Sequence, residues 1–522
     1  MSLQTPPDAP RFWLRHLFAI AFCLCLSAAL LPIWIGPYLP AVDWPQHLFL
    51  INLLGALDDP AFAFRDLFVE EPGWTYLAFY YSVHWLARLV PLEIAFKIWL
   101  SLLLTGIPLS LWFLSRSLKR SRWLCLLAFP LLFTYSFYWG LFSFMATLPW
   151  TFLAIGFFVR VLDGEWGTKR FWLCVAGSAT SLALVELTHA AAMVFLALAL
   201  PAMLLTTPSD RPRRIAAVLS VVPGVALLLM WLVTGQTRPP EIGAGPWQAA
   251  GPLLDPANYV FDPIARRLSE LPARLAGGFW GYADRPALFG WLAVIVLVIG
   301  LSIYRRQRPD MAIIARLRPL ILFLIAFGCY LFLPMDVKGY MYQIYPRYCQ
   351  IAALLLIVAL PFPLGPSYKI YAVAATVVGV YSGINLAVQF YQFNDEAREF
   401  DRVVEMIPPN SRIMHLVVNP KSKVSTHAVY LHYAALAAAR TGGVPSFSLA
   451  RHSPFPVHYR ADNPIPTPRW EWRPQAFDWK REASFYDVYL VRGMSAEKLF
   501  GRHLRRVEAI GEAGDWKLYR RK

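Results

Sequence analysis

The chain has 522 residues, of which 57% are hydrophobic and only 16% are charged. A soluble globular protein carries about a quarter charged residues, so this chain has too little polar surface to cover itself in water. The formal net charge of +16 would suit a nucleic-acid-binding protein. The basic residues, however, gather in short loops between apolar runs, where they orient membrane helices. The composition therefore predicts an integral membrane protein with no nucleic-acid partner.

Eleven apolar runs are long enough to cross a hydrocarbon core of about 30 Å. The runs lie near 15–36, 92–115, 122–138, 141–160, 171–188, 190–206, 213–234, 287–304, 318–334, 347–363 and 369–391. The first run is too long for a cleaved signal peptide and lacks a small-residue cleavage site. The predicted number of membrane spans could differ by one pair, because 171–206 could form a tight hairpin or one long bent helix.

Basic clusters at alternate junctions orient these runs. They comprise Arg11 and Arg15, Arg116 to Arg122, Lys169 and Arg170, Arg211 to Arg214, and Arg305 to Arg318. With eleven runs, every cluster falls on one side, which the positive-inside rule makes cytoplasmic. The N-terminus is then predicted to be cytoplasmic, and three segments are predicted to be extracytoplasmic: 37–91, 235–286 and the region after about 392. Within 37–91, the apolar stretch Tyr76 to Val90 is predicted as an interfacial helix, because counting it as a span would reverse every later cluster.

Two domains are predicted. Residues 1–392 form an all-α polytopic membrane domain, and residues 393–522 form a small C-terminal α/β or α+β soluble domain. The second region is polar, with short β-like runs and one helical run, at Ile413 to Val418, Asp487 to Val491, Trp516 to Tyr519 and Val429 to Ala439. The six cysteines fall in or at the start of apolar runs without metal-ligand spacing, so no metal site is predicted.

The first outer segment opens with Val42-Asp43-Trp44-Pro45-Gln46-His47. Proline favours the first turn of a helix, so a short amphipathic helix is expected to run from here to about Leu57. Asp43 and His47 are four residues apart and should lie close together at its start. They are candidate catalytic residues, and the alternative is that Asp43 is simply an N-cap.

Further polar candidates fall on the same predicted face. Glu186 and His189 lie at the outer junction of the fifth and sixth runs, where an ionisable pair is costly and indicates function, although a structural hinge is the alternative. Lys338 and Arg347 are cations on the outer side, and Arg347 could hold a phosphate through two hydrogen bonds or could only reach lipid headgroups. Tyr138 beside glycine, and Tyr342, could stack on a sugar or belong to an interfacial aromatic belt.

This arrangement resembles the GT-C superfamily of integral membrane glycosyltransferases, which use polyprenyl-phosphate-linked sugars. Asp43 in Val-Asp-Trp-Pro-Gln-His occupies the place of the acidic residue that those proteins carry early in a long outer loop. Tyr76 to Val90 looks like their juxtamembrane helix, Arg116 to Arg120 like the basic turn after their second span, and Pro346-Arg347-Tyr348 like their phosphate-contacting arginine position. The motifs cover about the first 120 residues, whereas the topology covers the whole chain.

The resemblance implies a sugar transfer on the extracytoplasmic face with inversion. Asp43 would be the general base, His47 would orient it, and Lys338 and Arg347 would bind the donor phosphate. Glu186, His189, Tyr138 and Tyr342 would line the cavity or contact the acceptor. The expected partners are membrane lipid, the polyprenyl-phosphate sugar and a glycan, lipid or protein acceptor, in a bacterial inner or plasma membrane.

No cofactor is predicted beyond the lipid-linked donor. The first loop has no Asp-x-Asp, which favours a metal-free mechanism like that of lipid A aminoarabinose transferases or protein mannosyltransferases and leaves a divalent metal open. A transporter or flippase of a lipid-linked sugar and a catalytically inactive scaffold protein are the alternative functions. Transporters often show internal repeats and midplane charges, and this sequence shows neither, which favours an enzyme.

Overall fold

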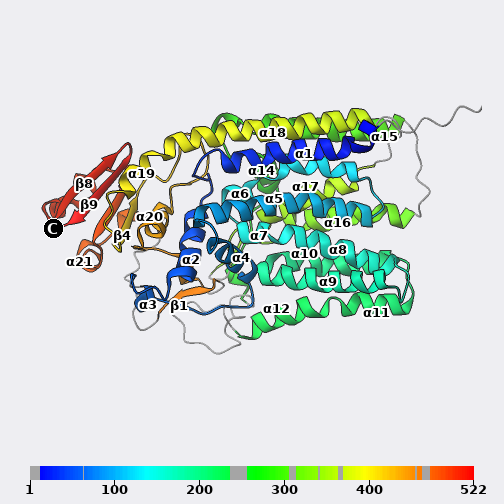
Figure 1. Ribbon diagram of the computed structural model, residues 1–522, viewed down its shortest axis with the longest axis horizontal. Helices are drawn as coiled ribbons and strands as arrows, with labels where there is room; N and C mark the ends of the chain where they lie inside the picture. Colours follow the sequence, from blue (N-terminus) through cyan, green and yellow to red (C-terminus); the bar gives the residue numbers. More distant parts are fainter. Residues whose placement is uncertain are drawn as a thin grey trace, which may run out of the picture.

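The computed structural model describes residues 12–62, 64–234, 255–304, 313–338, 341–361, 368–452, 455–460 and 471–522. Long helices run side by side along the longest axis of the molecule, and a β-sheet lies at one end (Figure 1). The principal helices of this bundle are α1 (Phe12–Trp34), α5 (Leu92–Ser117), α8 (Thr147–Asp163), α9 (Lys169–Thr188), α10 (Ala191–Thr206), α11 (Arg211–Leu219), α12 (Val222–Thr234), α15 (Arg285–Tyr304), α16 (Ile313–Phe332), α17 (Ile344–Ala359) and α18 (Tyr368–Ala397).

Seven helical segments of the described chain are long and apolar enough to cross a membrane. Two other apolar helices, α10 and α17, have 16 residues each. The prediction of a multi-pass membrane protein is confirmed, and the count of eleven spans is not. The run 171–206 divides at His189 into α9 and α10, so it does not form one long bent helix.

The predicted run 122–138 is not a regular membrane helix. It forms a 3₁₀ helix, η1 (Arg122–Leu131), with Pro130 inside it, followed by the short helices α6 (Tyr135–Tyr138) and α7 (Phe142–Met145). Proline removes one backbone donor, and irregular backbone at membrane depth is tolerated only where protein surrounds it. Leu124 to Phe129 meet this condition, since each is at most 2% exposed.

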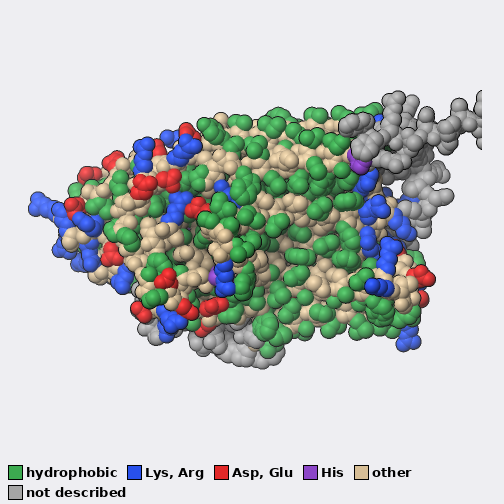
Figure 2. Space-filling view, viewed as in Figure 1, with side chains coloured by type: hydrophobic (Ala, Val, Ile, Leu, Met, Phe, Trp, Pro, Cys, Tyr) green, Lys and Arg blue, Asp and Glu red, His purple; other side chains and the backbone are tan. Residues whose placement is uncertain are grey.

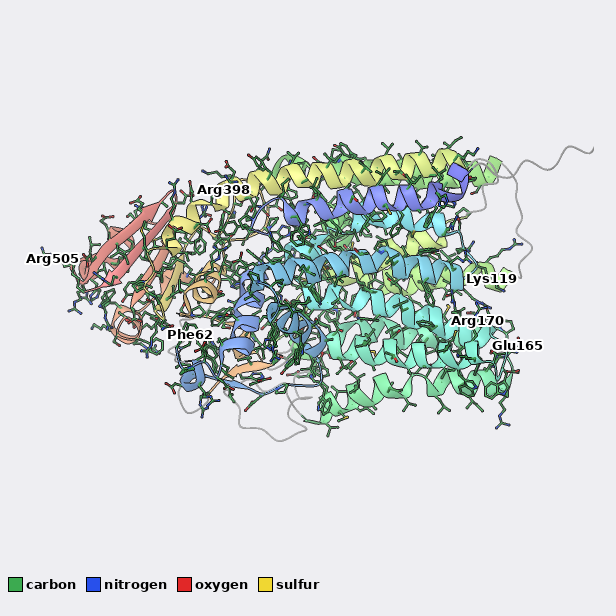
Figure 3. All side chains as sticks on the ribbon, in the orientation of Figure 1. Phe62, Lys119, Glu165, Arg170, Arg398 and Arg505 are labelled. Carbon is green, nitrogen blue, oxygen red and sulfur yellow. The ribbon has the colours of Figure 1, made fainter. Side chains whose placement is uncertain are left out.

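Charge is sorted along the molecule. The middle of the bundle is almost wholly hydrophobic on the visible face, one end carries mainly lysine and arginine, and the other end carries both signs (Figure 2). Lys119 and Arg170, from two of the predicted basic clusters, lie at the same end (Figure 3). The shorter elements outside the C-terminal region include α2 (Trp44–Ala56), α3 (Phe64–Leu67), β1 (Phe68–Glu70), α4 (Leu77–Ala87), η2 (Pro256–Asn258), β2 (Tyr259–Val260), α14 (Ile264–Leu275), η3 (Trp280–Tyr282) and β3 (Asp336–Val337).

The C-terminal part of the chain holds a five-stranded mixed sheet in the order β5-β4-β7-β9-β8. β4 lies parallel to β5 and β7, whereas β9 lies antiparallel to β7 and β8. The elements are α19 (Glu399–Val404), β4 (Arg412–Val417), α20 (Tyr433–Thr441), β5 (Val444–Pro445), η5 (Leu449–Arg451), β6 (Val457–Tyr459), η6 (Pro474–Ala476), α21 (Trp479–Glu482), β7 (Val488–Arg492), α22 (Ala496–Phe500), η7 (Gly501–Arg506), β8 (Val507–Ala513) and β9 (Trp516–Arg521).

This C-terminal region is joined to the segment 37–91 by three kinds of contact. Strand β1 of that segment pairs with β6 of the C-terminal region, and α2 packs against α20. Nη1 of Arg440 on α20 donates to the hydroxyl of Tyr38 at 3.1 Å. Residues separated by most of the chain therefore meet around the start of α2.

Candidate functional site

Asp43 lies at the N-terminus of α2 with its carboxylate turned away from the helix. Among the described residues its side chain makes no capping hydrogen bond, and it is 24% exposed. Because the carboxylate does not cap α2, the simple N-cap role is not supported. The helix itself differs from the amphipathic one expected: every residue from Trp44 to Ile51 is buried, because α4, α5 and α20 pack around it.

A tight turn after α6 sets the position of Asp43. The backbone N–H groups of Val42 and Asp43 donate to the carbonyls of Tyr138 at 2.9 Å and Trp139 at 3.2 Å. Gly140 follows with φ +79°, and a Cβ there would lie 2.8 Å from the backbone nitrogen of Asp43. Only glycine combines this left-handed conformation with such a close approach.

His47 links the same turn to α4. Its Nε2 lies 2.9 Å from the carbonyl of Gly140, and its Nδ1 lies 2.6 Å from the hydroxyl of Tyr80. A carbonyl only accepts, so Nε2 carries the proton and Nδ1 accepts from Tyr80. Burial lowers the pKa of His47, although the Asp43 charge opposes this, which agrees with a neutral ring.

His432 at the start of α20 faces Asp43 from the C-terminal region. Its Nε2 lies 3.3 Å from Oδ1 of Asp43, and its Nδ1 forms a very short contact with Oε2 of Glu471. Burial favours the neutral imidazole, but Glu471 and Asp43 outweigh it and raise the pKa of His432 to about 10. The ring is therefore a cation at neutral pH, flanked by two carboxylates.

Arg347 and His189 form a second cluster at the N-terminal end of α17 and the C-terminal end of α9. Nη1 of Arg347 and the hydroxyl of Tyr76 each lie 2.7 Å from Nε2 of His189. Nδ1 of His189 accepts from the backbone N–H of Ala191 at 3.1 Å, so a neutral ring carries its proton on Nε2. Arg347, Tyr76 and His189 thus bring N–H and O–H groups together, which makes this a donor-rich cluster suited to an anion.

Helix α4 connects the two clusters. Tyr80, which bonds His47, lies one turn after Tyr76, which bonds His189. Burial raises the pKa of Tyr76, the Arg347 charge opposes that rise, and the Asp43 charge adds to it. Asp43 and Arg347 therefore lie within electrostatic reach of the same hydroxyl.

The segment before α17 holds Arg347 and presents Lys338. Nε and Nη2 of Arg347 donate to the carbonyls of Gln343 at 3.0 Å and Tyr342 at 3.1 Å. Asp336 fixes the same turn by accepting from the N–H of Gln343 at 2.8 Å. Lys338 is exposed and Tyr342 is 45% exposed, so both side chains reach the surface of this segment.

Glu186 and Tyr138 are more deeply buried than the other candidates. Glu186 lies on α9 one turn before His189, and neither of its carboxylate oxygens has a hydrogen-bond partner among the described residues. The ring of Tyr138 packs on Gly278 and stacks on His427 with ring centroids 5.5 Å apart. Tyr138 contributes its backbone carbonyl to the Asp43 turn, while its ring lies inside this aromatic packing.

An apolar cavity of about 830 Å³ lies between α10, α12, α17 and the segment that follows α16, with Leu333, Pro334 and Val337. Its wall includes Ala190 and Ala191, directly after His189, and Ile344 and Tyr348, on either side of Arg347. The hydroxyl of Tyr348 donates to the carbonyl of Ala191 at 2.6 Å and joins these two parts of the wall. The cavity thus ends beside the donor-rich cluster. Within the described ranges, no group of three or more His, Cys, Asp or Glu side chains has metal-binding geometry.

No family model and no curated protein sequence matches this chain. Its structure, however, is similar to crystal structures of ArnT from Cupriavidus metallidurans over almost the full length. The apo structure aligns with a TM-score of 0.54 and 10% identity, covering 97% of each chain. The structure bound to undecaprenyl phosphate aligns with a TM-score of 0.55 and 11% identity, covering 98% of each chain.

The chain shares the fold of ArnT. The fold that the resemblance to the GT-C superfamily implied is thereby confirmed. The apo oligosaccharyltransferase of Archaeoglobus fulgidus also aligns, with a TM-score of 0.46 and 12% identity over 84% of this chain and 65% of its own. This TM-score is too low to establish a shared fold.

The sequence did not predict the contacts that four residues make at this site. These residues are Tyr76, Gly140, His432 and Glu471. Tyr76 and Tyr80 were expected only as interfacial aromatics, although their spacing of four places both on one helical face. His432 and Glu471 reach Asp43 through the docking of the C-terminal region, which no local pattern encodes.

Proposed function

We propose that this protein is a membrane glycosyltransferase that moves a sugar from a polyprenyl-phosphate donor to an acceptor on the extracytoplasmic face, with Asp43 as general base. The observation that carries this proposal is the placement of Asp43 and Arg347 within electrostatic reach of the same hydroxyl, that of Tyr76 at the start of α4. Asp43 has a carboxylate that does not cap its own helix, and Arg347 has a buried guanidinium at the end of an apolar cavity.

The Arg347 end suits the donor lipid. A polyprenyl chain needs an apolar channel, and the cavity between α10, α12 and α17 is lined by apolar side chains. The phosphate needs hydrogen-bond donors, and Arg347 can hold it through two N–H groups. Lys338 is exposed in the same segment and adds a second positive charge. The similar ArnT structure bound to undecaprenyl phosphate supports this choice of lipid.

The Asp43 end suits the chemistry. Asp43 would take the proton of an acceptor hydroxyl while that oxygen attacks the anomeric carbon of the donor sugar. The bond from this carbon to the phosphate oxygen breaks, and the electron pair leaves on the polyprenyl phosphate. Arg347 and Lys338 would stabilise the negative charge that develops there. Attack opposite the leaving group inverts the anomeric configuration.

The other predicted residues would play supporting parts. His47 holds the turn that positions Asp43 by donating to the carbonyl of Gly140. His189 contacts Nη1 of Arg347 and would help to hold the guanidinium in place. Glu186 and Tyr342 would contact the sugar or the acceptor, since one carboxylate is buried without a partner among the described residues and one ring is half exposed near Arg347.

A reconstitution experiment tests this function against the flippase alternative. The purified protein is placed in liposomes with radiolabelled undecaprenyl-phosphate pentoses and hexoses, and cell-envelope extract supplies the acceptors. A transferase moves label from the donor to the extract and leaves undecaprenyl phosphate. Translocation of intact labelled donor across the bilayer without any transfer would contradict the proposal and favour a flippase.

A further inference from the structure

We propose that Glu471 and His432 are positioning residues through which the C-terminal region completes the active site, by holding one oxygen of the Asp43 carboxylate and leaving the other for the acceptor. This inference rests on the proposed role of Asp43 as general base. It assigns a function to a region that otherwise lies outside the transmembrane bundle (Figure 1).

The three side chains form a line from the protein interior to the site. Glu471 and His432 have side chains only 2% and 7% exposed, whereas Asp43 is 24% exposed. Oε2 of Glu471 contacts Nδ1 of His432, and Nε2 of His432 lies 3.3 Å from Oδ1 of Asp43. The other oxygen of Glu471, Oε1, has no hydrogen-bond partner among the described residues, so its contact with His432 is its principal interaction.

The imidazole ring is held in one orientation. It stacks on the ring of Phe447 with centroids 6.0 Å apart and an interplanar angle of 15°. Gln46, on α2 three residues after Asp43, donates to the carbonyl of Phe447 at 3.2 Å and accepts from the N–H of Leu449 at 3.0 Å. The helix that carries Asp43 and the segment that supports His432 are therefore fastened to one another.

The charged groups around His432 favour the protonated form of its ring at neutral pH. The titratable groups that face it are Asp43 on the first outer segment, Glu471, His47 on α2 and His415 on β4. Burial lowers the pKa of both His47 and His415, so these rings add no positive charge at neutral pH. The His432 imidazolium thus lies between two carboxylates, which favour a proton on each of its two ring nitrogens.

The chemical consequence concerns Asp43. The N–H of His432 occupies Oδ1, so Oδ2 is the oxygen that meets the acceptor hydroxyl. His432 therefore fixes the direction in which the Asp43 carboxylate presents its free oxygen. During transfer the acceptor proton moves to Oδ2 and then to water, while His432 keeps its own proton throughout.

The test compares Glu471→Gln and His432→Gln with Glu512→Gln, a change of the same kind at an exposed position of the same region. We expect Glu471→Gln to lower kcat for sugar transfer at least about tenfold and to move the alkaline limb of the pH profile to lower pH by more than one unit. Undecaprenyl phosphate binding should be unchanged in all three variants. A structural role alone would lower the rate at every pH without moving the limb, and that result would overturn the proposal.

A second readout does not depend on turnover. The histidine NMR signal that is present in the wild type and absent from His432→Gln is assigned to His432. We expect the His432 ring to stay protonated between about pH 6 and pH 9 in the wild type and to titrate in this range in Glu471→Gln. Titration of the wild-type signal in this range would contradict the inference. Wild-type transfer by both variants, with an inactive Asp43→Asn, would refute this inference alone, whereas an active Asp43→Asn would refute the proposed function.

Discussion

The carbonyl of Gly140 accepts a hydrogen bond from Nε2 of His47 at 2.9 Å, and this bond closes the turn on which Asp43 rests. His47 donates across the chain to the turn that follows α6, while the backbone of that turn accepts from Asp43 itself. The proposed base is thus positioned by backbone contacts on one side and by His432 on the other.

Replacement of Gly140 by alanine should lower both activity and stability. The new Cβ would lie 2.8 Å from the backbone nitrogen of Asp43, and the residue would keep a positive φ. We expect a loss of about 1–3 kcal/mol in unfolding free energy and a large fall in transfer. Gly167→Ala is the control, because Gly167 has φ +80° with no described atom within 4 Å of the added Cβ. Equal effects of the two changes on transfer would contradict the account.

Replacement of Arg347 by lysine should weaken the binding of undecaprenyl phosphate about tenfold or more. Lysine keeps the charge but cannot offer two parallel N–H donors or hold the carbonyls of Gln343 and Tyr342 at the same time. Microscale thermophoresis with undecaprenyl phosphate measures the effect. Arg398→Lys, at a 61% exposed side chain, should bind like the wild type.

A bulky side chain in the apolar cavity should compete with the lipid chain. Ala197 lines the cavity, so Ala197→Trp should fill part of it and reduce affinity for undecaprenyl phosphate. Ala176 is an exposed alanine of α9 outside the cavity wall, and Ala176→Trp should have little effect. If both variants bind the lipid as tightly as the wild type, the polyprenyl chain lies elsewhere.

The thermal stability of the protein should fall as pH rises from about 6.5 toward 10. The pKa of His432 is raised from 6.5 to about 10, so in this window the folded state keeps a proton that the unfolded chain loses. Stability therefore decreases with pH wherever the unfolded state binds fewer protons. Scanning calorimetry between about pH 6.5 and pH 9 should show a smaller decrease in His432→Gln. An identical slope in both proteins would contradict the assigned charge.

Local sequence patterns anticipated much of the bundle and part of the site. Apolar runs predicted helices because a membrane span needs a minimum length, and the predicted segments at 92–115 and 171–188 coincide with α5 and α9. Glu186 and His189 were predicted as site residues because polar groups at membrane depth are costly, and Arg347 because it is a cation on the predicted outer side. The last two proved to be in direct contact.

The rest depends on contacts between distant parts of the chain. Composition alone could not reveal that the run 122–138 begins with a 3₁₀ helix at Arg122–Leu131, because its irregular backbone is stabilised by the helices packed around it. Likewise, His432 and Glu471 lie in an ordinary polar region of the sequence. They reach Asp43 only because α20 packs on α2 and because β6 pairs with β1.

The most direct test of the account is the single-turnover rate of sugar transfer by Asp43→Asn in liposomes loaded with the labelled donor that the wild type uses. The amide keeps the size of the side chain but cannot take the acceptor proton. Asp58→Asn, at a 75% exposed side chain of the same outer segment, is the matched control. We predict a rate at least about a hundredfold lower for Asp43→Asn, with unchanged undecaprenyl phosphate binding and a wild-type rate for the control. Transfer by Asp43→Asn at the wild-type rate would contradict the assignment of Asp43 as the base.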